Sequence, residues 1–172
     1  GQPVAVAFDR AGRLLVQSRE PAALFVVDPE TTRVTGRITL AVDSREDTGW
    51  SLFHANPGSN LACASCHPEG GDDGRTWDFT QAGEGLRNTV DLRGRGGTDH
   101  GPVHWSANFD EIQDFENDIV NAFGGSGLAH DGLPPNPPLD AARNAGSSAQ
   151  LDALAAWVGS LGAAPRSPYR EP

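Results

Sequence analysis

Cys63-Ala64-Ser65-Cys66-His67 contains the only two cysteines of this chain, and the fold of the second part of the chain depends on what they bind. Two cysteines separated by two residues and followed by histidine are the usual attachment signature of a c-type haem. The two thiols form thioethers with the haem vinyl groups, and the histidine ligates the iron. The motif therefore predicts one covalent haem, held by Cys63, Cys66 and His67.

Two other uses of a Cys-x-x-Cys pair agree less well with the rest of the sequence. A redox-active pair is expected near a βαβ pattern, and the Gly- and Asp-rich segments on either side of the motif show none. A structural zinc site needs four cysteine or histidine ligands, as a rule in two pairs, and the chain has no second cysteine pair. Covalent haem remains the favoured interpretation.

Composition limits the possible partners and the cellular location. The 172 residues can form one sizeable core or two small ones, and the net charge is −10. This charge disfavours nucleic acid and anionic membrane as partners and suits a basic redox partner protein. No apolar run approaches the roughly 18 residues of a membrane span. Because thioether attachment of haem takes place outside the cytoplasm, we expect a periplasmic or extracellular protein, with Gly1 a processed or truncated start.

Residues 1–41 have the pattern of a small antiparallel sheet. Four β-rich runs, at 4–8, 14–16, 23–27 and 34–40, alternate with turn signals. Four strands at a spacing of roughly ten residues match one blade of a β-propeller, although a generic four-stranded sheet is the alternative. Such a blade cannot bury both of its faces alone. We therefore expect it to pack on the haem domain, to self-associate, or to belong to a larger propeller.

A polar linker at 42–47 precedes a segment of different character, and 48–162 is expected to form a haem domain. The pattern predicts a short helix at 48–54, long Gly/Asp-rich loops over 68–98, and helices at 109–123 and 151–161. Asn108 and Ser148 are the expected N-caps of the last two helices. The long loops are explained if they wrap a haem. The Pro-rich tail, 163–172, is expected to be poorly ordered.

Longer stretches carry a family resemblance. The segment VAVAFDRAGRLLVQSREPAALFVVDPETTRVTGRITL resembles blades of YVTN-type propellers. The segments LACASCHPEGGDDGRTWDF, LRNTVDLRGRGG and GPVHWSANFDEIQDFENDI, within 47–161, are similar to haem domains of the diheme cytochrome c peroxidase superfamily. The resemblance implies an α+β chain: a blade-like sheet followed by a mainly α, loop-rich class I cytochrome c domain. It departs from that family in having one CxxCH motif where the peroxidases have two.

The sixth iron ligand determines which activity is expected. Methionine, the common choice in cytochromes c, is absent from the chain, and so is lysine. His104 and His130 are the main candidates. His54, His100, Tyr169, the N-terminal amine and an open site are the remaining ones. Bis-histidine ligation would favour electron transfer. An open site would favour a peroxidase-like enzyme, and a haem-bearing subunit of a larger extracellular assembly is a third hypothesis.

Several other residues are expected to surround the haem. Trp77 and Trp105 are candidates for packing on the porphyrin, with an ordinary core role as the alternative. Among Arg87, Arg93 and Arg95, the family resemblance favours Arg93 as a partner of a haem propionate. Asp72 and Asp73 are weak candidates for a calcium site, and a simple turn is the favoured alternative.

Overall fold

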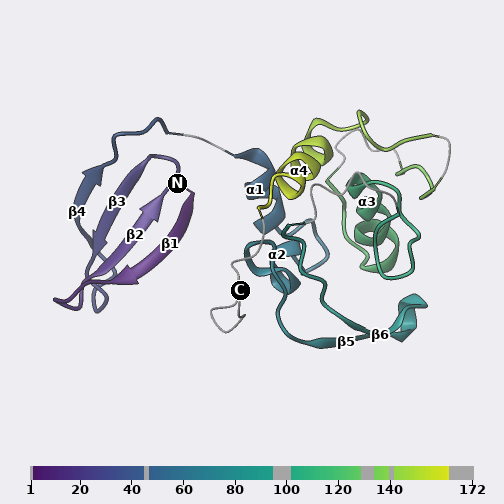
Figure 1. The fold of residues 1–172 in the computed structure, drawn as a ribbon, viewed down its shortest axis with the longest axis horizontal. Coiled ribbons are helices and arrows are strands. Elements are labelled where there is room, and N and C mark those ends of the chain that lie inside the picture. The colour runs from purple at the N-terminus through teal and green to yellow at the C-terminus, as the bar shows by residue number, and fades with distance from the viewer. Residues whose placement is uncertain (1, 45–46, 95–101, 129–133, 140–141, 163–172) are drawn as a thin grey trace, which may run out of the picture. The chain divides into compact units, whose positions relative to one another are not determined.

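The computed structural model describes residues 2–44, 47–94, 102–128, 134–139 and 142–162. The chain divides into two compact units, Gly1–Asp47 and Thr48–Pro172. The first contains only strands and the second contains the helices and a hairpin, so the chain has mixed α+β structure (Figure 1). No helix in the described part of the chain combines the length and apolarity that crossing a bilayer requires.

The first unit is a four-stranded antiparallel sheet. Its strands β1 (Pro3–Phe8), β2 (Leu14–Ser18), β3 (Ala23–Val27) and β4 (Val34–Thr39) pair in sequence order, as a simple meander (Figure 1). Four strands were expected here and four are present, with ends shifted by one or two residues. The turns follow local side-chain chemistry, because Asp9 and Asp28 each accept backbone N–H groups of the turn that follows them.

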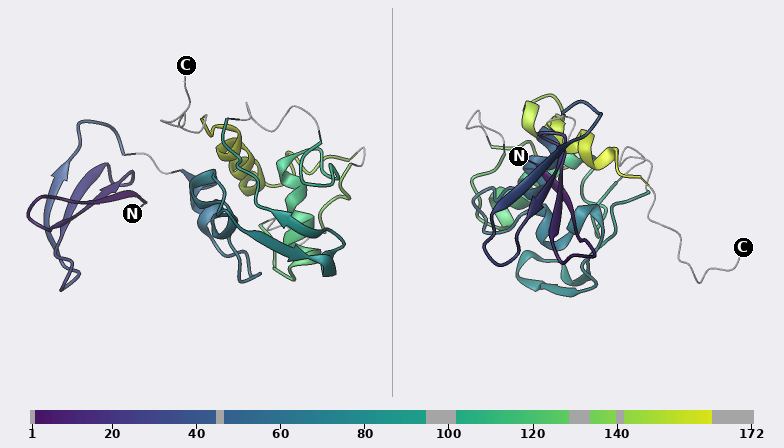
Figure 2. Two further views of the ribbon diagram at one scale, coloured as in Figure 1. Left: turned by 60° about the horizontal axis from the view of Figure 1, so that its bottom comes forward. Right: turned by 90° about the vertical axis from the view of Figure 1, so that its left-hand side faces the viewer.

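Two helices form the frame of the second unit. Helix α1 (Thr48–His54) packs along α4 (Ala149–Gly159), as Figures 1 and 2 show. Ser148 caps α4 as predicted, accepting the N–H of Leu151 at 3.4 Å. The packed core contains side chains from both helices and from the segment between them, namely Phe53, Ile119, Leu128, Leu151, Leu154, Trp157 and Val158.

The segment after the haem motif contains more structure than expected. Helix α2 (Cys63–Cys66) is followed by the 3-10 turn η1 (Pro68–Gly70) and by a hairpin of β5 (Thr76–Phe79) and β6 (Gly85–Asn88), with η2 (Thr80–Ala82) between its strands. The prediction of loops throughout 68–98 was therefore wrong for this hairpin. The strands are only four residues long, which is too short for sequence alternation to reveal them.

The helix expected at 109–123 begins later and is irregular. It contains η3 (Ile112–Asp114), α3 (Phe115–Asn117) and the π-helical turn η4 (Asp118–Ala122). Phe109 instead pairs with Val103 in an isolated β-bridge, and Asn108 does not cap the helix. The apolar stripe was read correctly, but the acidic residues Asp110 and Glu111 bind a neighbouring segment at Arg143 rather than form a first helical turn.

Candidate functional site

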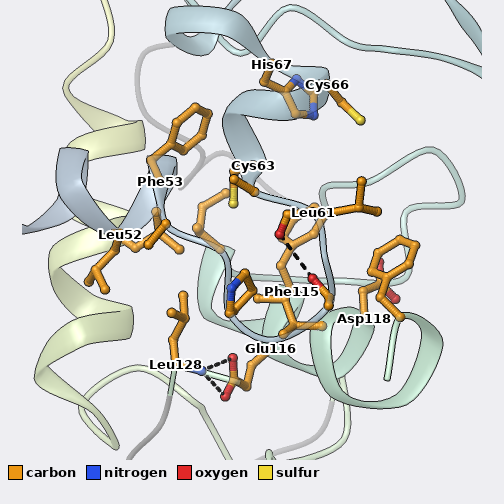
Figure 3. A pocket seen from close by; sticks show the side chains of 18 of the residues that line it. Leu52, Phe53, Leu61, Cys63, Cys66, His67, Phe115, Glu116, Asp118 and Leu128 are labelled. Carbon is orange, nitrogen blue, oxygen red and sulfur yellow. Dashed lines mark hydrogen bonds between the residues drawn. The ribbon is translucent and has the colours of Figure 1, made fainter. Parts of the chain in front are cut away.

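The CxxCH motif, Cys63–His67, lies at one wall of a predominantly apolar cavity in the second unit (Figure 3). Cys63, Cys66 and His67 all contribute to the lining. The other walls come from α1, the hairpin, the irregular helix, α4 and the segments between these elements. Their apolar side chains include Leu52, Phe53, Leu61, Trp77, Phe79, Leu92, Ile112, Phe115, Ile119, Phe123, Leu128, Leu151, Leu154 and Val158. An apolar cavity with a few polar groups is typical of a cofactor site.

The backbone around α2 positions the histidine. His67 Nδ1 donates to the carbonyl of Gly71 at 3.2 Å. With Nδ1 as the donor, a neutral ring has its lone pair on Nε2, the nitrogen that a metal could then take. Gly71 is held close by the 3-10 turn, because its own N–H donates to the carbonyl of Pro68. The chain after the motif therefore fixes the position of the ring.

Burial disfavours the charged form of all three groups of the motif. It raises the pKa of the Cys63 thiol to about 11 and also raises the pKa of Cys66. Burial lowers the pKa of His67, against the opposing effect of the carbonyls of Gly71 and Val90. A reactive redox pair needs a thiol of lowered pKa, so these thiols are poorly suited to disulfide exchange. A neutral imidazole is what iron ligation requires.

These residues fit a covalent haem. Two thiols and one imidazole line the same cavity, their order along the chain matches the motif, and the surrounding side chains are apolar. The imidazole already makes the backbone hydrogen bond that a metal-bound histidine usually has. A structural zinc site built from four cysteine or histidine ligands is not present in the described cavity lining, in which Cys63, Cys66 and His67 are the residues of these two types.

The two tryptophans named from the sequence have different positions. Trp77 lines the cavity, and its indole Nε1 donates to Asp73 Oδ2 at 2.9 Å. Trp105 is absent from the described lining. It packs against Phe79, with ring centroids 5.3 Å apart, and donates to the carbonyl of Asn88 at 2.8 Å. Trp105 therefore supports a wall of the cavity through Phe79.

His104 also lies outside the described lining, and both of its ring nitrogens have partners. Nδ1 donates to Asn108 Oδ1 at 2.8 Å, and Nε2 faces Asp118 Oδ2 at 3.7 Å. The ring stacks on Phe109 with centroids 4.9 Å apart. Ligation of iron by His104 would require it to give up the contact with Asp118.

The remaining histidines do not identify a sixth ligand for a haem iron. His130 lies outside the described residues, as do His100 and Tyr169. His54 is described and is not part of the cavity lining; its Nδ1 donates to the carbonyl of Trp50 at 2.8 Å, and Nε2 faces Glu69 at 3.0 Å.

The candidate arginines make ion pairs with nearby carboxylates. Arg93 forms a two-pronged pair with Asp91, at 3.0 and 2.7 Å, and Arg87 pairs with Glu84 at 3.2 Å. Neither residue lines the cavity, and Arg95 lies outside the described residues. An ion pair between Arg93 and a haem propionate stays a prediction. To form it, Arg93 would have to share its guanidinium with Asp91 or release that carboxylate.

Asp72 and Asp73 form turns. Asp72 accepts the N–H of Gly74, and Asp73 accepts the N–H of Arg75 together with the Thr89 hydroxyl and the Trp77 indole. This is the turn arrangement that the sequence favoured over calcium. The carboxylate of Asp73 therefore ties the start of the hairpin to its end.

Sequence reasoning missed two carboxylates in the cavity wall, Glu116 and Asp118. Glu116 is only 2 % exposed, and both of its oxygens accept the N–H of Leu128, at 2.8 and 3.0 Å (Figure 3). Burial raises the pKa of Asp118, while His104 opposes the shift. A signal for Glu116 was present, because it falls four residues after Ile112 and three before Ile119, on the apolar stripe itself.

Comparisons with known proteins identify no relative. No family model matches this chain, and searches of curated proteins and of solved structures find no significant match.

Proposed function

We propose that the second unit binds one c-type haem covalently through Cys63 and Cys66, with His67 as the proximal iron ligand, and that the chain transfers electrons. The observation that carries the proposal is that these three side chains line one apolar cavity, with the His67 ring held by the Gly71 carbonyl. When bound, the haem supplies one-electron chemistry at its iron. The apolar side chains that line the cavity, Trp77 among them, would keep water away from it.

The same proposal includes an assignment of each unit to a known type of fold. A helix before the motif, the motif itself, wrapping segments and a final amphipathic helix packed on the first are the features of a class I cytochrome c domain, and α1, α2 and α4 are in that order. The four-stranded meander of the first unit supports a likeness to a propeller blade. Because thioether attachment of haem takes place outside the cytoplasm, the proposed location is the periplasm or the outside of the cell. The net charge of −10 supports a basic redox partner.

Haem attachment can be tested directly. The chain is produced in cells with a cytochrome c maturation system and then denatured, and haem that stays with the polypeptide is measured. We expect one haem per chain, loss of covalent haem in the C63S/C66S double variant, and a changed iron spectrum in His67→Ala. His54→Gln is the matched control, because that imidazole is nearby but outside the cavity lining. A purified chain without covalent haem would overturn the proposal.

A peroxidase-like enzyme is the second candidate, and one observation favours it. Within the described lining, His67 is the single histidine, and the other ionisable groups besides the two cysteines are the carboxylates Glu116 and Asp118. An iron without a second protein ligand would be open to peroxide, and a carboxylate close by could act as an acid–base group. Electron transfer by a bis-histidine haem requires instead that His104 or His130 reach the iron.

The optical spectrum separates the two candidates. A low-spin spectrum that is indifferent to hydrogen peroxide and carbon monoxide supports the carrier, because the iron then has six ligands. A high-spin spectrum that changes with peroxide supports the enzyme. His104→Ala and His130→Ala, made singly with His54→Gln as control, identify the sixth ligand by loss of the low-spin signal. If neither variant loses a low-spin signal, both histidine assignments are wrong.

A further inference from the structure

Asp73 lies just before the hairpin and accepts hydrogen bonds from three groups. Its Oδ1 accepts the Thr89 hydroxyl at 2.6 Å and the backbone N–H of Arg75 at 3.0 Å. Its Oδ2 accepts the indole N–H of Trp77 at 2.9 Å. Trp77 lines the cavity, whereas Thr89 follows the second strand of the hairpin. The carboxylate is therefore fixed between a cavity-lining side chain and the chain that leaves the hairpin.

The segment that contains Asp73 is also bound to the histidine of the motif. The carbonyl of Gly71, two residues before Asp73, accepts a hydrogen bond from His67 Nδ1 at 3.2 Å. The carbonyl of Gly70 accepts the backbone N–H of Leu92 at 2.9 Å, and Leu92 lines the cavity as well. These bonds hold the segment, and with it Asp73, close to the motif.

The charge of Asp73 acts on two residues of the motif. Burial is the largest cause of the raised pKa of Cys66, and the charge of Asp73 adds to it, against the opposing charge of Arg75. Burial lowers the pKa of His67, and there the charge of Asp73 opposes the shift. Asp73 is thus electrostatically coupled to the side chains that would be bonded to the haem.

Asp73 differs from Asp91, whose charge also acts on His67. Asp91 forms a two-pronged ion pair with Arg93, so a positive charge opposes its own. None of the three groups that donate to Asp73 is charged. Their hydrogen bonds, that of the Thr89 hydroxyl first, lower the pKa of Asp73. Its carboxylate therefore stays ionised at neutral pH, held in place by neutral partners.

We propose that Asp73 lowers the reduction potential of the haem by holding a fixed negative charge beside the motif. This inference rests on the proposed haem binding. Delivery of one electron by a redox partner reduces ferric to ferrous iron, so the positive charge at the iron decreases by one. A negative charge close by stabilises the more positive, ferric state. The oxidised form is therefore favoured, and the potential is lower than it would be without Asp73.

The test is the midpoint potential of the purified haem protein, measured by spectroelectrochemical titration at neutral pH. Asp73→Asn removes the charge and nearly keeps the shape of the side chain, so we expect a more positive midpoint than in wild type. Asp73→Ser is a second neutral variant, for which a positive shift is also expected. Asp73→Glu keeps the charge on a longer side chain and is expected to stay close to wild type.

Asp78→Asn is the matched control. Asp78 is an exposed carboxylate of the same hairpin. It is one residue after Trp77 in β5, so its side chain is on the opposite face of the hairpin. The variant loses the same charge as Asp73→Asn but is expected to leave the midpoint unchanged. A shift equal to that of Asp73→Asn would show that only net charge matters, and would overturn the proposal.

The pattern across the variants separates charge from structure. An unchanged midpoint in Asp73→Asn overturns the proposal. An equal shift in Asp73→Glu also overturns it, because the disturbed hydrogen bonds would then explain both results. Urea unfolding of the haem-free chains measures that disturbance separately, and we expect Asp73→Glu to lose stability without the shift in potential.

Covalent haem per chain is measured first, because it separates this inference from the proposed function. A wild-type chain without covalent haem overturns the proposed function and this inference with it. One haem per chain, with the same midpoint in wild type and in both neutral variants, overturns this inference alone.

Discussion

At the scale of single residues, the motif combines covalent chemistry with burial. Cys63 and Cys66 lie in the short helix α2, and burial raises the pKa of both thiols. A thiol with a raised pKa stays protonated and resists accidental oxidation or metal capture, because the thiolate is the reactive form. The cavity therefore disfavours disulfide exchange by these two thiols.

The reactivity of Cys63 in haem-free protein tests this environment. In a Cys66→Ser background, the rate of alkylation by iodoacetamide is expected to rise with pH toward a midpoint of about 11 in the folded protein, compared with 9.0 for an ordinary thiol. The same variant unfolded in urea is the control and should show the ordinary midpoint. A folded-state midpoint at or below 9.0 would contradict the burial argument.

The sign of the accompanying effect on stability follows from linkage. Between pH 9.0 and about 11 the unfolded chain loses the thiol proton while the folded chain keeps it. The unfolded state then binds fewer protons, so the free energy of unfolding decreases as pH rises through this interval. Below pH 9.0 the thiol is protonated in both states and contributes no pH dependence.

At the scale of elements, helices α1 and α4 approach each other closely in the second unit, and Gly49 makes this possible. A Cβ atom at this position would overlap the carbonyl oxygen of Ala153 and lie 2.5 Å from Trp157 Cβ. Helix α1 carries Leu52 and Phe53 into the cavity. The separation of the two helices therefore sets where one wall of the cavity lies.

Gly49→Ala tests this packing. The added methyl group has backbone on one side and the Trp157 side chain on the other, so the helices must move apart; we expect a loss of about 1–3 kcal/mol in the free energy of unfolding, measured with urea. Gly162→Ala is the matched control, because a Cβ there meets nothing within 4 Å. If the two variants have the same free energy of unfolding, the α1–α4 interface accommodates a methyl group at position 49, and the packing argument is wrong.

The helices and strands also differ in how well local sequence patterns predict them. Helix α4 was predicted closely, since its apolar spacing and its cap at Ser148 are both local signals. The hairpin β5–β6 was missed because each of its strands is only four residues long, too short for an alternating pattern to stand out. The start of the irregular helix was displaced because Glu111 binds the backbone of Asn144 and Ala145, more than thirty residues later.

At the scale of the whole molecule, the chain combines two units that differ in how they form a core. The second unit has a packed core between its helices. The first unit has a regular sheet whose large apolar side chains are on both faces, with Ala22 and Ala23 its only buried hydrophobic residues among those described. The first unit therefore leaves most of its large apolar side chains outside a core, with Val6, Phe8 and Ile38 more than half exposed.

The sequence alone predicted the four strands and the capped final helix correctly, and its assignment of the CxxCH motif to haem stays a prediction. Each depends on residues close together in the chain, whose spacing sets which side chains share a face or a bond. Only the tertiary structure decided that His104 lies outside the described cavity lining with Asn108 and Asp118 as partners, and that the buried carboxylate of Glu116 holds Leu128. The physical reason is that these placements depend on packing and charge contacts between segments far apart in sequence, which no local pattern encodes.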